Sequence, residues 1–262
     1  MPTASKKRIL TIAGSDCSGG AGIQADLEQI YTQGHLASTV ITALVSETEH
    51  TISKITPTPL AHFRDELQLL QESHLSGTSD YQIDAVKIGL ITTCQQVQAI
   101  ADFLAKVKVP AVIDPVLKAT AGDTLLIQDP LEDFLESLTR NLLQKVTLCT
   151  PNQNETHTLL HHVKLDTPQA LSTQLNTAFL VKSAGYTDSH ITDHLYHPKE
   201  KAPQAFTSEK RANVDLHGSG CRLSTNIACN LVTNSLEASI LQAKHTQAQL
   251  YQDASPSSAG FL

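Results

Sequence analysis

Short apolar runs rich in β-branched residues alternate along the chain with segments in which apolar residues recur every three or four positions. The first kind of run is typical of buried strands and the second of amphipathic helices. Runs of the first kind span residues 8–13, 38–45, 83–89, 110–116, 146–151 and 178–183. The alternation predicts an α/β fold in which a mainly parallel central sheet carries helices on both faces.

The predicted helices fall between these strands and after the last one. The clearest periodic segments are 22–34, 59–74, 94–107, 129–145 and two helices after Gly220. Residues 193–207 (DHLYHPKEKAPQAFT) instead predict two short antiparallel strands around a turn at the sheet edge. No linker divides the chain, so we expect a single domain over residues 1–252 and a flexible, low-complexity tail over 253–262.

The composition is that of a soluble globular protein and disfavours two classes of partner. Hydrophobic residues make up 40% and charged residues 17% of the 262 residues, which is enough for one large core. A net charge of −7, the absence of Trp and an aromatic content of 4% disfavour nucleic acid. No apolar stretch approaches the roughly 20 residues that a membrane span needs.

The cysteines and the N-terminal segment indicate a compartment. Five cysteines are widely spaced and contain no C-x-x-C pair, which argues against a disulfide framework and against a zinc site. The apolar run at residues 9–13 is too short for a secretory signal. We therefore expect a cytoplasmic protein in a reducing environment.

Residues with useful chemistry follow the predicted strands, at the edge where open parallel sheets bind ligands. After the first strand comes AGSDCSGGAGIQADL, in which residues 20–25 also match the dinucleotide pattern G-x-G-x-x-A. Five residues separate that pattern from Gly14 at the strand end, and Asp26 lies in the second turn of the helix. These features favour a loop that binds a small molecule over a dinucleotide site, with a plain glycine turn as the third interpretation.

Two further strand ends carry carboxylates. The sequence VIDPV places Asp114 at a strand end, where it either reaches the ligand edge or starts an Asp-Pro turn. The sequence TPNQNE puts Asn152 and Glu155 three residues apart, on one face of the first turn of a helix. The same spacing matches a capping box with Asn152 as the N-cap, so a structural role and a ligand-binding role both stay open.

The stretch HGSGCRLS, residues 217–224, sets two glycines at the start of a long periodic segment. Gly218 and Gly220 let a ligand approach the backbone, and we expect the free N–H groups of Gly220, Cys221 and Arg222 to form an anion hole for a phosphate. The helix dipole would also stabilise a Cys221 thiolate, which suits a proton acceptor or a nucleophile. The alternative is a plain helix start with a buried cysteine.

Taken in order, AGSDCSGGAGIQADL, ITALV, KIGLI, IDPV, TPNQNE, LVKS and HGSGC resemble the hydroxymethylpyrimidine and phosphomethylpyrimidine kinases of thiamin biosynthesis, members of the ribokinase-like superfamily. The resemblance spans residues 8–248. It implies a ribokinase-like three-layer sandwich. It also implies ATP-dependent phosphorylation of 4-amino-5-hydroxymethyl-2-methylpyrimidine, of its monophosphate, or of both.

The resemblance further assigns roles to the matching residues. It implies a pyrimidine pocket lined by Gly14, Asp26, Glu47, Gly89 and Leu90. It implies an anion hole for the transferred phosphoryl group and a base for the substrate hydroxyl, formed by Gly218, Ser219, Gly220 and Cys221.

On the nucleotide side, the resemblance implies that Asp114 and Glu155 hold Mg²⁺, partly through water, against the phosphates of ATP. Asn152 and Lys182 would face the nucleotide. The family also suggests a homodimer, whereas the need for a monovalent cation stays open.

The chain departs from the family pattern at four places, the mildest of which is K-I-G-L at residues 87–90 in place of K-I-G-M, a change in an apolar wall. The family usually has T-A-Q-N or V-A-Q-N where residues 45–48 read VSET, so Glu47 replaces a pocket glutamine. Residues 182–185 read KSAG in place of K-G-G-H, which adds bulk beside the nucleotide, and the family's glycine-rich C-terminal tail is absent. Two alternatives therefore stay open: a pyridoxal or pyridoxine kinase, and a catalytically weak relative that binds the pyrimidine.

Overall fold

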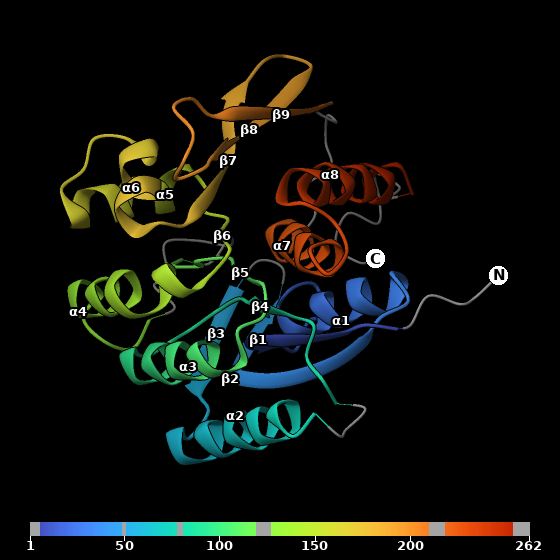
Figure 1. Cartoon of the computed structure of the whole chain (residues 1–262), viewed down its shortest axis with the longest axis vertical. Coiled ribbons are helices and arrows are strands. Elements are labelled where there is room, and N and C mark those ends of the chain that lie inside the picture. The colour runs from blue at the N-terminus through green and yellow to red at the C-terminus, as the bar shows by residue number, and fades with distance from the viewer. Residues whose placement is uncertain (1–5, 49–50, 78–80, 119–126, 210–217, 254–262) are drawn as a thin grey trace.

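The computed structural model describes residues 6–48, 51–77, 81–118, 127–209 and 218–253. These residues form one nine-stranded sheet in the order β3-β2-β1-β4-β5-β6-β7-β8-β9 (Figure 1). The strands are β1 Arg8–Asp16, β2 Leu36–Thr48, β3 Thr51–Pro57, β4 Ala85–Ile88, β5 Ala111–Ile113, β6 Leu148–Cys149, β7 Ala178–Tyr186, β8 His190–Tyr196 and β9 Gln204–Glu209. Strands β2, β1, β4, β5, β6 and β7 pair in parallel, whereas β3, β8 and β9 pair antiparallel with their neighbours.

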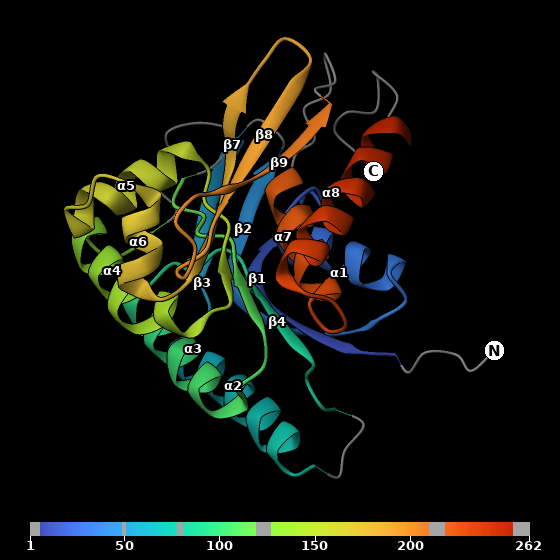
Figure 2. The same cartoon turned by 45° about the horizontal axis from the view of Figure 1, so that its top comes forward.

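Helices cover both faces of the sheet, which gives three layers (Figure 2). One face carries α1 Gly22–Thr32, α7 Ser219–Asn230 and α8 Leu236–Asp253. The other carries α2 Leu60–Leu75, α3 Cys94–Val107, α4 Leu131–Ser137, α5 Gln153–Val163 and α6 Pro168–Leu175. No helix in the described part of the chain is both long and apolar enough to cross a bilayer.

The central strands are buried on both faces. In β1, residues 9–13 are fully buried, and all four residues of β4 are buried as well. The largest apolar cluster lies between the sheet and the helices α2 to α6, and a second joins β5, β6, β7 and β8 to α7 and α8. Burial on both faces explains why these strands read as short continuous apolar runs in the sequence.

The structure confirms the predicted alternation of strands and helices, and it confirms the antiparallel pair near the sheet edge as β8 and β9. Strand β3 was not predicted, because its residues are exposed or only half-buried and carry no clear alternation. The predicted helix 129–145 is interrupted: after α4, residues 138–142 form a π-helical turn and residues 143–145 a 3₁₀ turn. Helix α8 runs to Asp253, and the rest of the predicted tail lies outside the described residues.

Three register shifts distort the sheet: one lies between Ser46 and Glu47 in the pairing of β2 with β3, and the other two are as follows. The register between β1 and β2 shifts between Ala13 and Ser15, around Gly14. The register between β7 and β8 shifts between Val181 and Gly185. These last two shifts lie beside the cavity described next, and bulges of this kind commonly redirect side chains at active sites.

Candidate active site

A cavity of about 1760 Å³ opens at the carboxyl ends of the parallel strands. This is the edge at which an open parallel sheet binds ligands. The predicted site residues that line it are Gly14, Glu47, Leu90, Asp114, Asn152, Glu155, Lys182, Gly218, Ser219, Gly220 and Cys221. Two predicted pocket residues, Asp26 and Gly89, do not line it.

The N-terminus of α7 points its first backbone amides toward this cavity. Gly218 is the N-cap residue, in the left-handed region with φ of 75°, and the helix begins at Ser219. The N–H of Arg222 donates to the carbonyl oxygen of Gly218 at 2.9 Å, so it is already part of the helix. The predicted anion hole must therefore be moved back by one residue, to the amides of Ser219, Gly220 and Cys221.

Glycine at position 220 keeps this helix end close to the charged groups of the sheet. A Cβ atom there would lie 3.1 Å from Oδ2 of Asp114 and 3.2 Å from Nζ of Lys182. Both contacts are tighter than nearly all real Cβ contacts. Gly220 thus allows the positive end of the helix dipole to approach the carboxylate of Asp114.

The glycine loop after β1 packs directly against α7. A Cβ atom on Gly218 would lie 2.1 Å from the carbonyl oxygen of Gly20, so only glycine fits. Arg222 closes the contact, because its Nη1 donates to the same oxygen at 2.8 Å and its Nη2 pairs with Glu28 at 2.8 Å. This contact fixes the glycine loop relative to the N-terminus of α7, which would bind phosphate.

Asp16 organises the glycine loop from within and was not singled out from the sequence. Its carboxylate accepts hydrogen bonds from the backbone N–H of Ser18 and of Ala21, both at 2.7 Å. The first amide of α1, that of Gly22, faces the thiol of Cys221. The glycine loop is therefore held in a conformation that contacts α7. This agrees with the interpretation of the loop as part of a small-molecule site.

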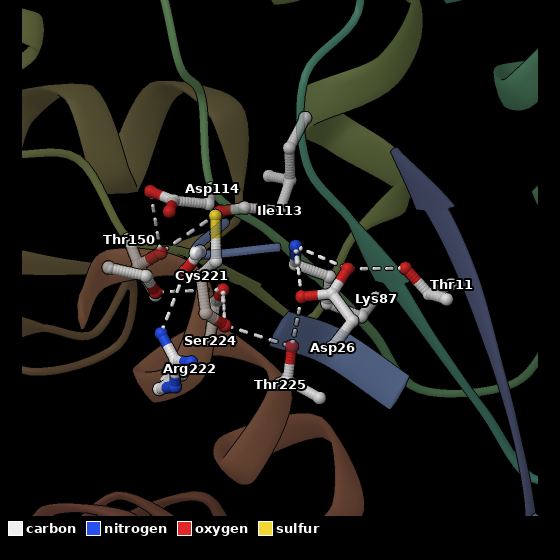
Figure 3. Close-up of polar contacts among 12 residues, drawn as sticks. Thr11, Asp26, Lys87, Ile113, Asp114, Thr150, Cys221, Arg222, Ser224 and Thr225 are labelled. Carbon is white, nitrogen blue, oxygen red and sulfur yellow. Dashed lines mark hydrogen bonds and ion pairs between the residues drawn. The ribbon is translucent and has the colours of Figure 1, made fainter. Parts of the chain in front are cut away.

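Asp26 is a buried structural counter-ion rather than a pocket residue (Figure 3). Its side chain is fully buried and accepts two hydrogen bonds from Nζ of Lys87, at 2.7 and 2.8 Å. The hydroxyl groups of Thr11 and Thr225 donate to the same carboxylate, at 2.5 and 2.7 Å. The prediction that Asp26 lines the pyrimidine pocket is corrected for this reason: every one of its oxygens is used inside the protein.

The prediction for Gly89 is corrected as well. A Cβ atom there would lie 2.9 Å from Nζ of Lys87 and 3.0 Å from Cβ of Ala13. Gly89 therefore makes room for the buried amine instead of lining the pocket. Lys87, which lines the cavity, was missed by the sequence prediction.

Charges around Lys87 keep it protonated. Burial alone would lower its pKa, but the carboxylate of Asp26 raises the pKa above the usual lysine value, and Cys221 and Asp114 add to this effect. Lys87 is thus a fixed positive charge at the base of the cavity.

Cys221 lies at the third helical position of α7 and lines the cavity. Burial raises the pKa of its thiol; Lys87 lowers it, while Asp26 and Asp114 raise it. The expected stabilisation of a thiolate by the helix dipole is therefore corrected: the thiol is the resting form. A thiolate formed there would be a stronger base, because its conjugate acid holds the proton more tightly.

Asp114 and Lys182 form an ion pair across the cavity floor. The distance from Nζ of Lys182 to Oδ1 of Asp114 is 2.6 Å, and both side chains are largely buried. Burial alone would lower the pKa of Lys182, but Asp114 and Glu155 raise it. Both predicted residues reach the site, and each is the other's partner there.

Asn152 and Glu155 form the capping box of α5. The side chain of Asn152 accepts from the N–H of Glu155 at 2.9 Å, and the N–H of Asn152 donates to Oε2 of Glu155 at 2.8 Å. The structural interpretation left open by the sequence is thus present. Both residues also line the cavity, so the cap does not exclude a role toward a ligand.

The donor set at this end of the cavity suits Mg²⁺. Asp114 and Glu155 are 2% and 7% exposed, and the charge of Asp114 raises the pKa of the neighbouring Glu155. In the described part of the chain, no group of three or more His, Cys, Asp or Glu side chains could hold a metal ion. Mg²⁺ typically takes one or two carboxylates and completes its shell with water and phosphate oxygens, which fits two carboxylates beside a phosphate site.

Ser183 shows how the chain accommodates its departure from K-G-G-H. Its φ is 54°, a left-handed conformation that favours glycine. Its N–H donates to Oδ1 of Asp193 at 2.8 Å, and the other oxygen of Asp193 pairs with Lys244 of α8. The buried carboxylate therefore holds the strand in the shape that places Lys182 at Asp114.

The cavity has two parts: an end beside the glycine loop, called the acceptor end below, and a second lobe. At the acceptor end, Gly14 lies against Leu90 and Val45, since a Cβ on Gly14 would be 2.9 and 3.4 Å from their methyl groups. Half-buried Glu47 also lines this end. The second lobe extends toward β8, β9 and α8, where apolar side chains include Ile191, Phe206 and Leu241.

A family model described as phosphomethylpyrimidine kinase matches residues 16–259. The chain belongs to the phosphomethylpyrimidine kinase family. The hydroxymethylpyrimidine/phosphomethylpyrimidine kinase of Escherichia coli (strain K12) is 34% identical over 232 residues, which are 85% of this chain and 82% of that protein. These findings confirm the predicted family and the predicted enzyme class.

A second relative is longer. The thiamine biosynthesis multifunctional protein of Corynebacterium efficiens is 33% identical over 232 residues, which are 86% of this phosphomethylpyrimidine kinase family member and 30% of that protein. The chain thus spans most of the Escherichia coli kinase and less than a third of the multifunctional protein.

Among solved structures, the pyridoxal kinase from Staphylococcus aureus in complex with AMP-PCP resembles this family member with a TM-score of 0.78 and 24% identity. The superposition covers 94% of this chain and 88% of that chain. The likeness shows a shared fold and confirms the predicted ribokinase-like architecture.

Proposed function

We propose that the protein transfers the γ-phosphoryl group of ATP to the hydroxymethyl group of 4-amino-5-hydroxymethyl-2-methylpyrimidine, and a second phosphoryl group to the resulting monophosphate. The observation that carries this proposal is the shared cavity. A small apolar pocket at Gly14, Val45 and Leu90 opens onto the N-terminus of α7 and the Asp114–Lys182 pair. A ring-sized acceptor and a polyphosphate would therefore meet in one chamber. The family assignment supports the same activity.

At the acceptor end, the flat face of the pyrimidine would pack on Leu90 and Val45, with its polar edge toward Glu47. Cys221 lines the cavity between this pocket and the carboxylate of Asp114. In this position its thiolate, formed when the thiol gives its proton to solvent, would accept the hydroxyl proton as the oxygen attacks the phosphorus. The raised pKa of the Cys221 thiol makes its thiolate a suitable base for an alcohol.

At the donor end, the amides of Ser219, Gly220 and Cys221 would bind the oxygens of the transferred group. Lys182 would exchange part of its contact with Asp114 for the more highly charged phosphate. The lobe between β9 and α8 would receive the adenine ring. Catalysis would then rest on positioning and charge stabilisation, as is usual for phosphoryl transfer.

Asp114 and Glu155 would hold Mg²⁺, partly through water, and the ion would neutralise phosphate charge. Asn152 would stay engaged with Glu155 in the cap, which fixes that carboxylate at the cavity wall. Lys182 supplies the remaining positive charge from the protein itself.

Release of ADP in the presence of each candidate alcohol tests the proposal. The acceptors are the hydroxymethylpyrimidine, its monophosphate and pyridoxal, each with and without Mg²⁺. We expect Mg²⁺-dependent turnover with both pyrimidines and a much smaller kcat/KM with pyridoxal. Preference for pyridoxal would replace the proposal by a pyridoxal kinase, and binding of the pyrimidine without turnover would replace it by a binding protein.

Three finer features can also be tested: a homodimer, which the family resemblance suggests, a monovalent cation requirement, which the sequence leaves open, and a cytoplasmic location, which the cysteine pattern suggests. The protein would form a homodimer, which light scattering coupled to size-exclusion chromatography would test. A monovalent cation requirement would appear as a dependence of kcat on K⁺ against Na⁺. A cytoplasmic location would be tested by cell fractionation.

A further inference from the structure

Lys87 lines the cavity beside the reacting groups, and the mechanism above gives it no task. It lies on β4, its side chain is fully buried, and it nevertheless lines the cavity. Lysine is almost never fully buried unless it is paired. Asp26 accounts for the pairing but leaves open why the amine is placed beside the reacting groups.

The hydrogen bonds of Lys87 leave one donor over. Its ammonium group has three N–H donors. Two of them reach Oδ1 and Oδ2 of Asp26, at 2.7 and 2.8 Å. Among the described residues, no third partner accepts from it. A buried charged donor without an acceptor is costly, so the third N–H calls for an oxygen supplied by a ligand.

The surroundings of the amine keep space for such an oxygen. Gly89 has no side chain, and a Cβ there would approach Nζ to 2.9 Å. Ala13, the next nearest neighbour of that Cβ position, has the smallest side chain that carries a Cβ. Figure 3 shows Asp26 on one side of the amine and Cys221 and Asp114 on the other. The three groups influence one another electrostatically, as near neighbours do.

We propose that the third N–H of Lys87 donates to the acceptor oxygen of the substrate, so that Lys87 is a further catalytic residue of this kinase. The inference rests on the proposed function. Cys221 first gives its thiol proton to solvent; the hydroxyl proton then passes to the Cys221 thiolate, the oxygen forms a bond to the γ-phosphorus, and the bond from that phosphorus to the ADP oxygen breaks. Lys87 keeps its own protons throughout and stabilises the negative charge that develops on the oxygen.

Asp26 acts through Lys87 and is therefore a positioning residue. Its two oxygens take two of the three N–H donors, and hydroxyl groups of Thr11 on β1 and Thr225 on α7 hold the carboxylate from opposite sides. The amine is thus held to a single direction by elements far apart in the sequence. This arrangement explains why a buried ion pair is placed here in spite of its desolvation cost.

The test must avoid leaving a lone buried charge. Replacing Lys87 alone would leave Asp26 unpaired in the core, which usually destabilises a protein strongly. The double variant Lys87→Met/Asp26→Asn removes both charges with little change in size. The control is Lys7→Met/Asp84→Asn, because that pair has the same chemistry at 3.1 Å, is partly exposed and does not line the cavity.

Calorimetry would measure the affinity of each protein for two ligands. One is the hydroxymethylpyrimidine and the other is 4-amino-2,5-dimethylpyrimidine, which lacks only the hydroxyl group. We expect the natural protein and the control to prefer the hydroxymethyl ligand by roughly 10-fold or more, the scale of a charged hydrogen bond. The Lys87→Met/Asp26→Asn variant should lose most of this preference and bind the dimethyl ligand normally.

A preference that survives in the Lys87→Met/Asp26→Asn variant would overturn the inference while leaving the proposed function intact. Failure of the natural protein to bind or phosphorylate the hydroxymethylpyrimidine would overturn both. A measurement on the natural protein covers the case in which the variant does not fold. The 5-aminomethyl analogue would place a second ammonium against Lys87 and should bind more weakly than the dimethyl ligand, so binding as tight as that of the hydroxymethyl ligand would overturn the inference.

Discussion

Replacing Glu155 by Gln should remove a pH-dependent loss of stability while leaving the cap of α5 in place. Burial raises the pKa of Glu155 to about 7; Lys182 opposes this effect and Asp114 adds to it. A glutamine at this position can still accept from the N–H of Asn152, so the capping box survives the change. What disappears is the charge that the protein buries at neutral pH.

The sign and size follow from the two pKa values. The folded pKa of about 7 lies above the reference value of 4.5, so the folded protein holds this proton more tightly than the unfolded chain. The stability from this group is fully present below about pH 4.5 and is lost as the pH rises through 7. The whole loss is on the order of 3 kcal/mol, and about 2 kcal/mol of it falls between pH 5.5 and pH 8.

The assay is thermal unfolding in EDTA across that pH range. For a chain of this size 1 kcal/mol corresponds to roughly 2–4 °C in Tm. The Tm of the natural protein should therefore fall by roughly 4–8 °C more than that of Glu155→Gln between pH 5.5 and pH 8. Glu72→Gln, which removes an exposed carboxylate from α2, should run parallel to the natural protein.

Adding Mg²⁺ with a non-hydrolysable ATP analogue gives the second half of the test. If Glu155 faces the metal, the cation favours its charged form, and the extra loss at pH 8 should shrink in the natural protein only. If the Tm of the natural protein and of Glu155→Gln changed in parallel with pH in EDTA, the raised pKa of the buried Glu155 would be refuted. If Mg²⁺ changed the Tm of the natural protein and of Glu155→Gln equally, Glu155 would have a role in capping α5 and none in binding the metal.

Three more predictions concern the same cavity. Cys221→Ala should lower kcat by roughly 100-fold or more, the scale for loss of a general base, with Tm and substrate affinity nearly unchanged; near-normal turnover in steady-state assays would remove it from the mechanism. An ionised Glu47 offers only acceptors to a neutral ring nitrogen, so the two groups can pair only when one of them carries a proton. Aminopyrimidine affinity measured by calorimetry should therefore weaken from pH 6 to 8.5 in the natural protein and stay flat in Glu47→Gln. Gly218→Ala should cost several kcal/mol in urea unfolding, because its Cβ would lie 2.1 Å from the oxygen of Gly20 and its φ is 75°; a cost below about 1 kcal/mol would show that the two loops can separate.

The fold could be predicted because burial on both faces leaves a plain trace in the sequence. Strand β5 is an apolar run followed directly by Asp114, and both properties are visible without a structure. Strand β3 shows the limit of this reasoning, since none of its residues is buried. Its place is fixed by pairing with β2, and a hydrogen-bonded edge leaves no hydrophobic pattern.

Some cavity residues could be predicted by the same logic, because a residue that ends a parallel strand reaches the ligand edge whatever its neighbours are. Asp114 was found in this way, and Lys182 was found through the family resemblance of LVKS. Their mutual ion pair was not, because the pairing of side chains across a cavity depends on distances that strand order alone does not give. The offset of the anion hole has a similar cause: where α7 begins depends on the backbone angles of Gly218.

Asp26 and Lys87 show what a motif hides and what the chemistry of a strand could have revealed. Asp26 was placed in the pocket because it accompanies the glycine loop, although its position in the second turn of α1 turns it toward the sheet and α7. Lys87 stands inside an apolar run, and a lysine in a strand buried on both faces must find a carboxylate. A search for the carboxylate that pairs with Lys87 would have led to Asp26. It would also have shown that Lys87 keeps one N–H donor for a ligand. A buried charge in an otherwise apolar strand is thus a functional signal in its own right.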